Sequence, residues 1–163
     1  MGYLGDPRAI WDLARRREAT QSQWPSHNKM SSKYWIVGIL GEAAFADKAG
    51  LPMNMEDQPM GDGGWDFDTP IGKIDSKATE IGPGKWQVLP VNPDKVVADI
   101  YFLSWVRFGG AWEQRRIKQL GWCRADVVRA APIRGMKIPG VRKHHVQLEQ
   151  LQDMELLYQL LKQ

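Results

Sequence analysis

Cysteine is almost absent from this chain of 163 residues, with Cys123 as the single example. One cysteine cannot form an internal disulfide or supply the several thiolates of a cysteine-based zinc site. The sequence also lacks any apolar run near the roughly 18 residues of a transmembrane helix, the longest extending from Tyr34 to Leu40. The charged start from Met1 to Arg8 differs from a signal peptide. These absences predict a soluble, intracellular, cytoplasmic protein with no disulfide partner and no membrane partner.

Histidine is also scarce, with three examples in the chain. His27 is isolated in a polar connector, whereas His144 and His145 are adjacent. Neighbouring residues point in different directions in a helix and in a strand, so we do not expect this pair to bind one metal ion together. A nucleic-acid contact by one of the two is left open.

Charge of one sign is scarce in two long segments of the chain, although the net charge is only +3. The segment 41–80 has nine acids against three lysines, a net charge of −6, and the segment 107–143 has ten bases against two acids, a net charge of +8. An acidic centre followed by a basic segment is typical of a metal site within a surface that binds a polyanion. The alternative is that the basic residues are scattered, solvated charges.

Helix and strand patterns alternate along the chain, which predicts one α/β domain. Asp6 and Pro7 mark a helix start, because Asp is a common N-cap and Pro is favoured at the first helical position. We expect helices over 7–20, 31–49, 125–131 and 148–161, strands over 85–91, 96–108 and 112–123, and loops over 51–64 and 131–145.

Two short alternating runs around Thr69-Pro70-Ile71-Gly72 predict a β-hairpin. If Pro70 and Ile71 are the central turn residues, the numbers of opposed residues sum to 141, and Asp66 lies across from Asp75. One face would carry Asp66, Asp68, Lys73, Asp75 and Lys77, and the other would carry Trp65, Phe67, Ile74, Ser76 and Ala78.

The opposed pair Asp66 and Asp75 is unfavourable unless a cation lies between the two carboxylates. Mg²⁺ is typically held by one or two carboxylates, with water and phosphate oxygens completing the shell. Lys77 would stand beside the same place and could hold a water or neutralise charge on a phosphate. Asp62 is a second-ranked candidate for the first acid. The alternative interpretation is an ordinary solvated hairpin face whose charges pair weakly.

Glu42 is the third acid of interest, because its helical neighbours are mostly apolar. An unpaired charge on a buried helix face costs several kcal/mol, so this carboxylate requires a partner. A metal ion, a cationic catalytic group or a structural arginine would each satisfy it.

This order of residues, a helix with Glu42, then Asp66, then Asp75-Ser76-Lys77, resembles the PD-(D/E)XK nuclease superfamily. The resemblance implies that Asp66 and Asp75 bind Mg²⁺, that Lys77 assists the attacking water, and that Glu42 is the additional helix acid. Mn²⁺ is expected to substitute for Mg²⁺. The chain departs from the superfamily in having Trp65 where a proline often precedes the first acid. It also lacks a Gln-x-x-x-Tyr helix soon after the lysine.

The implied fold is α/β, with a central mixed sheet of about four to five strands flanked by helices, as in restriction endonucleases. A single nuclease domain would span 1–163, with an N-terminal helix and connector over 1–30, a catalytic core over 31–130, and a basic loop and C-terminal helix over 131–163.

The implied function is a Mg²⁺-dependent deoxyribonuclease, an endonuclease that hydrolyses phosphodiester bonds. The resemblance is to small stand-alone members, such as phage-encoded or mobile-element nucleases or Holliday-junction resolvases. The alternatives are a structure-specific junction resolvase and a catalytically inactive DNA-binding module of the same fold. RNA as the substrate and a homodimeric state are left open. We expect the basic segment to contact the nucleic acid through Arg115, Arg116, Lys118, Arg134, Lys137, Arg142 and Lys143.

Overall fold

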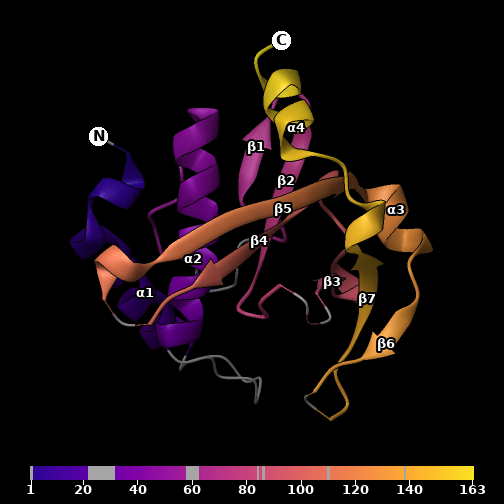
Figure 1. The fold of residues 1–163 in the computed structure, drawn as a ribbon, viewed down its shortest axis with the longest axis horizontal. Helices are drawn as coiled ribbons and strands as arrows, with labels where there is room; N and C mark the ends of the chain where they lie inside the picture. Colours follow the sequence, from indigo (N-terminus) through magenta and orange to yellow (C-terminus); the bar gives the residue numbers. More distant parts are fainter. Residues whose placement is uncertain are drawn as a thin grey trace.

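The computed structural model describes residues 2–21, 32–57, 63–83, 85, 87–109, 111–137 and 139–163. Within these ranges the helices are α1 (Pro7–Gln21), α2 (Ser32–Ala49), α3 (Ala125–Ala130) and α4 (Met154–Leu161). The strands are β1 (Phe67–Thr69), β2 (Gly72–Thr79), β3 (Val88–Val91), β4 (Ile100–Arg107), β5 (Arg116–Arg124), β6 (Ile133–Gly135) and β7 (Arg142–Gln147). Figure 1 shows their arrangement.

The strands form two sheets, so the α/β class is confirmed. The larger sheet has the order β1-β2-β4-β5 and is mixed, because β2 and β4 run parallel while the other neighbours are antiparallel. The smaller sheet has the order β3-β7-β6 and is antiparallel. The predicted loop over 131–145 is therefore wrong, since it contains β6 and the start of β7. The strand predicted over 96–108 is β4, which lies between β2 and β5 as expected of an apolar strand.

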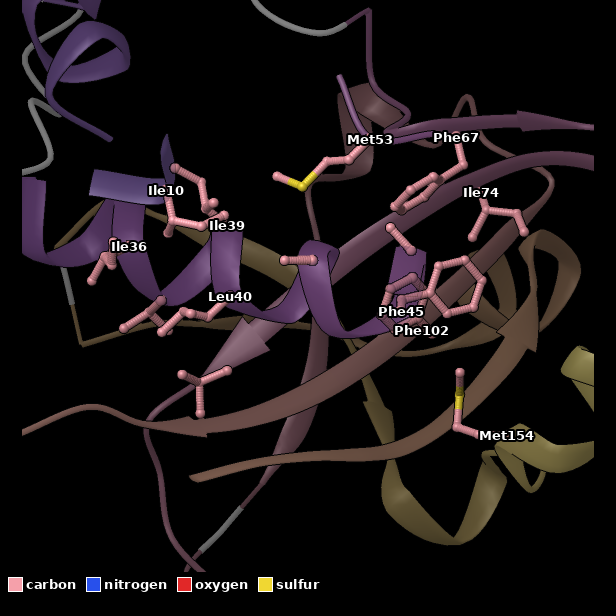
Figure 2. Packing of buried hydrophobic residues seen from close by; sticks show 14 of the residues in the cluster. Ile10, Ile36, Ile39, Leu40, Phe45, Met53, Phe67, Ile74, Phe102 and Met154 are labelled. Atoms are coloured by element: carbon pink, nitrogen blue, oxygen red, sulfur yellow. The ribbon is translucent and has the colours of Figure 1, made fainter. Parts of the chain in front are cut away.

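Helix α2 packs on one face of the larger sheet and builds the main core there. Phe45 stacks on Phe102 of β4, with ring centroids 4.4 Å apart, and meets Phe67 of β1 edge-on at 5.1 Å. Figure 2 shows these rings beside Ile74, with Ile39 farther along α2. All five side chains are almost completely buried, and this packing fixes α2 against β1 and β2.

A second apolar cluster lies on the other face of the larger sheet. It joins Tyr101 and Leu103 of β4 to Leu89 of β3, Val128 of α3 and Val146 of β7. Because paired residues of a sheet point to the same side, Asp75 and Lys77 share this face with Tyr101 and Leu103, their partners on β4. The smaller sheet is thereby held next to the face that carries both charged residues.

The helix ends agree with capping rules. Asp6 accepts a hydrogen bond from the backbone N–H of Ala9 at 3.0 Å, as expected of the N-cap of α1. The last helix begins later than predicted, because Asp153 is its N-cap and Gln152 forms a bridge with Trp122. No helix in the described part of the chain is long and apolar enough to cross a membrane.

Candidate functional site

The hairpin of β1 and β2 has the predicted register. Phe67 pairs with Ile74 and Asp68 pairs with Lys73, so opposed numbers sum to 141. Phe67 and Ile74 are buried beneath α2, whereas Asp68 is exposed on the other side. The alternation of charged and apolar faces was therefore predictable within the hairpin itself.

Asp66 lies just outside the ladder, at the place where β1 has not yet begun. Its backbone N–H donates to the carbonyl of Ile74 at 2.9 Å, and its Oδ2 accepts from the backbone N–H of Ser76 at 2.7 Å. The Asp66 carboxylate thus occupies the edge of β2 that a longer β1 would have covered. It is turned towards Asp75 and Ser76 by these two bonds.

Trp65 contradicts the predicted alternation. Its ring lies 3.5 Å from Nζ of Lys73, a residue expected on the opposite face, and it packs on the second apolar cluster. The alternation ends because the chain leaves the ladder at Asp66. The other candidate acid, Asp62, lies outside the described residues.

The charge of Asp66 is disfavoured by its burial and by the carboxylates around it. Burial raises the pKa of Asp66 well above its ordinary value, and the nearby carboxylates of Glu42 and Asp75 raise it further, while Lys77 and the Ser76 N–H act in the opposite direction. Asp75 is only 4% exposed, and its Oδ2 forms an ion pair with Nζ of Lys77. The structure therefore brings together all four residues predicted for the catalytic site.

Glu42 reaches this group from α2 and is itself nearly buried. Its Oε1 lies 3.5 Å from Nη1 of Arg17 in α1, so one of its partners is the arginine that the sequence left open as an alternative. Sequence reasoning did not select Arg17, because it stands in a run of three arginines with no pattern to distinguish it.

The donor set fits a hard divalent cation. Asp66 and Asp75 offer carboxylate oxygens, the ligands that Mg²⁺ and Mn²⁺ prefer, and Glu42 lies near enough to raise the pKa of Asp66. Among the described residues, no three acidic, histidine or cysteine side chains are already arranged as a metal cage. Since Mg²⁺ commonly takes only one or two protein carboxylates, the relevant site is the Asp66 and Asp75 pair, with Glu42 as a further ligand or a water acceptor.

A second lysine stands near Lys77. Burial lowers the pKa of Lys143 in β7, and the neighbouring ammonium groups of Lys77 and Lys95 lower it further. Lys95 belongs to a short 3₁₀ turn (Pro93–Lys95) and was not among the predicted residues, since only its turn was visible in the sequence. Lys143 is thus repelled by two other ammonium groups, one of which, Lys77, is paired with Asp75, and such a concentration of positive charge is suited to a phosphate.

The predicted nucleic-acid residues separate into groups. Arg134, Lys137, Arg142 and Lys143 belong to the β6–β7 hairpin, at the lower right of Figure 1. Arg134 and Lys143 are directly paired across the two strands, and like charges at such positions are unfavourable without an anion.

Arg116 and Lys118 lie on β5 instead. Arg116 pairs with Arg107 and Lys118 pairs with Trp105 of β4. By the alternation along β4, Trp105 and Arg107 share the sheet face of Leu103, which is also the face of Asp75 and Lys77. A surface hollow of about 420 Å³ lies there, lined by residues that include Trp105, Arg107 and Glu80.

Arg115 does not join either group. Its guanidinium donates to the carbonyl oxygens of Trp112 at 2.8 Å and Leu4 at 3.4 Å, and it stacks on the Trp112 ring. These contacts tie the start of β5 to the N-terminal segment, so we assign Arg115 a structural role in place of the predicted contact.

The two adjacent histidines are buried in β7. Nδ1 of His144 lies 2.8 Å from the carbonyl of Ala131, and Nε2 of His145 lies 3.2 Å from Sδ of Met136. Their rings have different neighbours, as predicted, and both are too buried for direct contact with a nucleic acid.

Comparisons of the chain with family models, with curated proteins and with solved structures find no match.

Proposed function

We propose that this protein is a Mg²⁺-dependent deoxyribonuclease of the PD-(D/E)XK type, with a fold of the restriction-endonuclease kind. The observation that carries the proposal is the meeting of Asp66, Asp75, Lys77 and Glu42 at the uncovered edge of β2. Their sequence order, with two acids and a lysine on a hairpin and one acid on the preceding helix, is the order of the superfamily. We infer an endonuclease, as the resemblance implies.

Asp66 and Asp75 would hold the cation, and Glu42 would bind it directly or through water. A bound Mg²⁺ supplies Lewis-acid stabilisation of phosphate oxygens and lowers the pKa of a bound water. Lys77 then orients the attacking water and, with its positive charge, offsets the charge that develops on the phosphate. The ion pair with Asp75 holds the ammonium group of Lys77 in place for this role.

The DNA backbone would contact two basic surfaces beside the carboxylates. One is the β6–β7 hairpin, which contributes Lys143 next to Lys77. The other is the open face of β4 and β5, with Arg107, Arg116 and Lys118, all of them exposed. Phosphate contacts of this kind fix the position of a duplex and make its binding dependent on salt.

The direct test is a cleavage panel of single-stranded, duplex, flapped and four-way-junction DNA with Mg²⁺ or Mn²⁺, and with EDTA as control. We expect cleavage of at least one DNA form that requires the cation. Asp75→Ala should abolish it while leaving the fold intact, as judged by circular dichroism. Salt-sensitive binding without cleavage of any form would replace this proposal with the inactive DNA-binding module. Selective cleavage of the junction would specify a resolvase.

A further inference from the structure

Arg17 is a nearly buried cation next to the carboxylate group. It lies near the end of α1, yet its guanidinium contacts two other segments of the chain. Nη1 lies 3.5 Å from Oε1 of Glu42, and Nη2 donates to the carbonyl of Asn54 at 3.2 Å. The guanidinium also lies 5.9 Å from the ring centroid of Trp35 in α2. With a side chain only 11% exposed, Arg17 is held beside Glu42 by several independent contacts.

The reason for such a cation follows from the charges around Asp66. Three carboxylates meet there, and Glu42 and Asp75 each disfavour the charge of Asp66. Lys77 forms an ion pair with Asp75. Arg17 forms one with Glu42, so both of the carboxylates that repel Asp66 have a cation from the chain itself. Without the guanidinium of Arg17, the three carboxylates would carry more uncompensated negative charge where little water reaches them.

We propose that Arg17 is a positioning residue that neutralises Glu42 while no metal ion is bound, and that it competes with a divalent cation for the Glu42 carboxylate. Binding of the cation at Asp66 and Asp75 would weaken the Arg17–Glu42 pair and let Glu42 turn towards the cation or its waters. The N-terminal helix is thereby part of the metal site. This inference rests on the proposed function, because it requires that the cation site exists. The test below distinguishes failure of the cation site from failure of the role assigned to Arg17.

The test compares Arg17→Gln with Arg16→Gln by thermal unfolding, in EDTA and with excess Mg²⁺ or Mn²⁺. Arg16 is a matched control, because it donates to the carbonyl of Met55 at 2.9 Å and lies 3.6 Å from Asp57, on the same loop, but does not contact Glu42 in the structure. We expect Arg17→Gln to lower the Tm in EDTA by about 5 °C, because removing one partner of a nearly buried pair is costly. The rise in Tm on adding the cation should then be larger than in the wild type.

Arg16→Gln should show the same cation-induced rise as the wild type. A purely structural role for Arg17 would lower the Tm equally with and without the cation, and that result would overturn the inference. If the wild type shows no stabilisation by either cation, the cation site and the proposed function fail together.

Calorimetric titration with Mn²⁺ gives a second readout that does not depend on cleavage. Removing the competing arginine should tighten Mn²⁺ binding by at least about fivefold, a typical size for coupling between two ligands of one site. The gain should vanish when Glu42→Gln is added, since Arg17 acts through that carboxylate. If Arg17→Gln does not fold, Arg17→Lys keeps the charge but loses the planar fork that reaches Glu42 and Asn54 together, and should bind Mn²⁺ with intermediate affinity. Mn²⁺ affinity equal to that of the wild type in the variant that folds would overturn the inference.

Discussion

The carboxylate of Asp66 accepts a hydrogen bond from the backbone N–H of Ser76 at 2.7 Å, just before β1 begins and beside the part of β2 that β1 does not cover. A side chain thereby takes the place of a neighbouring strand at the edge of the sheet. The backbone N–H of Asp66 donates to Ile74 and its carboxylate accepts from Ser76, the two residues on either side of Asp75. This bond explains how an aspartate outside any strand can be as well positioned as Asp75 within one. It also allows the charge of Asp66 to be tested separately from its hydrogen bond.

Asp66→Asn keeps an oxygen that can accept from Ser76 but removes the negative charge. We expect Mg²⁺-dependent cleavage to fall at least about a hundredfold, because the amide is a much weaker ligand for a hard cation. In EDTA the Tm should stay the same or rise, since the repulsion from Glu42 and Asp75 is relieved. Asp68→Asn is the control, because Asp68 is exposed and pairs with Lys73 on the same hairpin. Equal cleavage by Asp66→Asn and the wild type would exclude Asp66 as a ligand.

Lys77 is predicted to act in catalysis as well as in folding, and two substitutions separate the roles. Lys77→Met leaves the buried carboxylate of Asp75 without this ion pair, so it should lose both stability and cleavage. Lys77→Arg retains the charge and should retain most of the stability, yet lose cleavage by about a hundredfold, because a guanidinium does not reproduce the position of the ammonium group. Cleavage rates and denaturant midpoints measure the two effects.

Lys73→Met serves as the comparison for these variants. It removes the contact with the Trp65 ring, which is worth about 1 kcal/mol between two half-buried side chains, and should leave cleavage close to that of the wild type. Full cleavage by Lys77→Arg, together with a loss of cleavage in Lys73→Met as large as that in Lys77→Met, would show that general positive charge, and not the position of Lys77, matters.

The hairpin could be predicted in register because all its determinants are local. A turn and the alternation around it fix which residues oppose one another, and Phe67 and Ile74 were correctly assigned to the buried face. The prediction that failed concerns Trp65, just before the first strand of the hairpin. Strict alternation predicts that Trp65 and Lys73 lie on opposite faces of the hairpin, but the two side chains are in contact. Alternation along the sequence does not indicate where the pairing between the strands stops.

Contacts with other elements, which no pattern within one segment reveals, account for the other errors. Strand β6 is exposed along its whole length, so its sequence has no apolar alternation, and it exists because β7 pairs with it and with β3. Arg17 is 25 residues from Glu42 in the chain, and no periodicity connects them. The apolar surroundings of Glu42 predicted that a partner was needed, but only the packing of α1 on α2 identifies one as Arg17.

DNA binding should depend on salt through particular basic residues. Lys143 and Lys118 lie on the two proposed surfaces. Lys143→Ala and Lys118→Ala should each reduce the magnitude of the slope of log affinity against log salt concentration by about one, which corresponds to the loss of one phosphate contact. Arg115→Ala should leave the slope unchanged and instead lower the Tm, because Arg115 binds backbone carbonyls of Trp112 and Leu4. Fluorescence anisotropy on a labelled duplex at several salt concentrations, with inactive Asp75→Ala as the parent, measures the slopes. A slope lowered by Arg115→Ala but by neither lysine variant would contradict the proposed surfaces.

His145 is predicted to make the protein sensitive to acid. Burial lowers the pKa of His145, and the nearby charge of Arg134 lowers it further, so the folded protein favours the neutral ring. As the pH falls below about 6.5, the ordinary pKa of histidine, the unfolded chain takes up a proton before the folded one does, and stability decreases. The contribution of His145 is therefore complete above that pH and is lost progressively as the pH falls towards the lowered pKa.

The measurement is urea unfolding in EDTA between about pH 5 and pH 7.5. The free energy of unfolding of His145→Gln should fall less steeply with decreasing pH than that of the wild type, because glutamine does not titrate, although its absolute stability will be lower where a buried ring has been replaced. Arg134→Gln should give an intermediate slope, since it removes one of the two causes of the lowered pKa and leaves the burial in place. Carboxylates elsewhere contribute equally to all three proteins, so the difference between the curves isolates the histidine. Parallel curves for the wild type and His145→Gln would show that the folded protein accommodates the charged ring, and that the β7 core is open to protons at this residue.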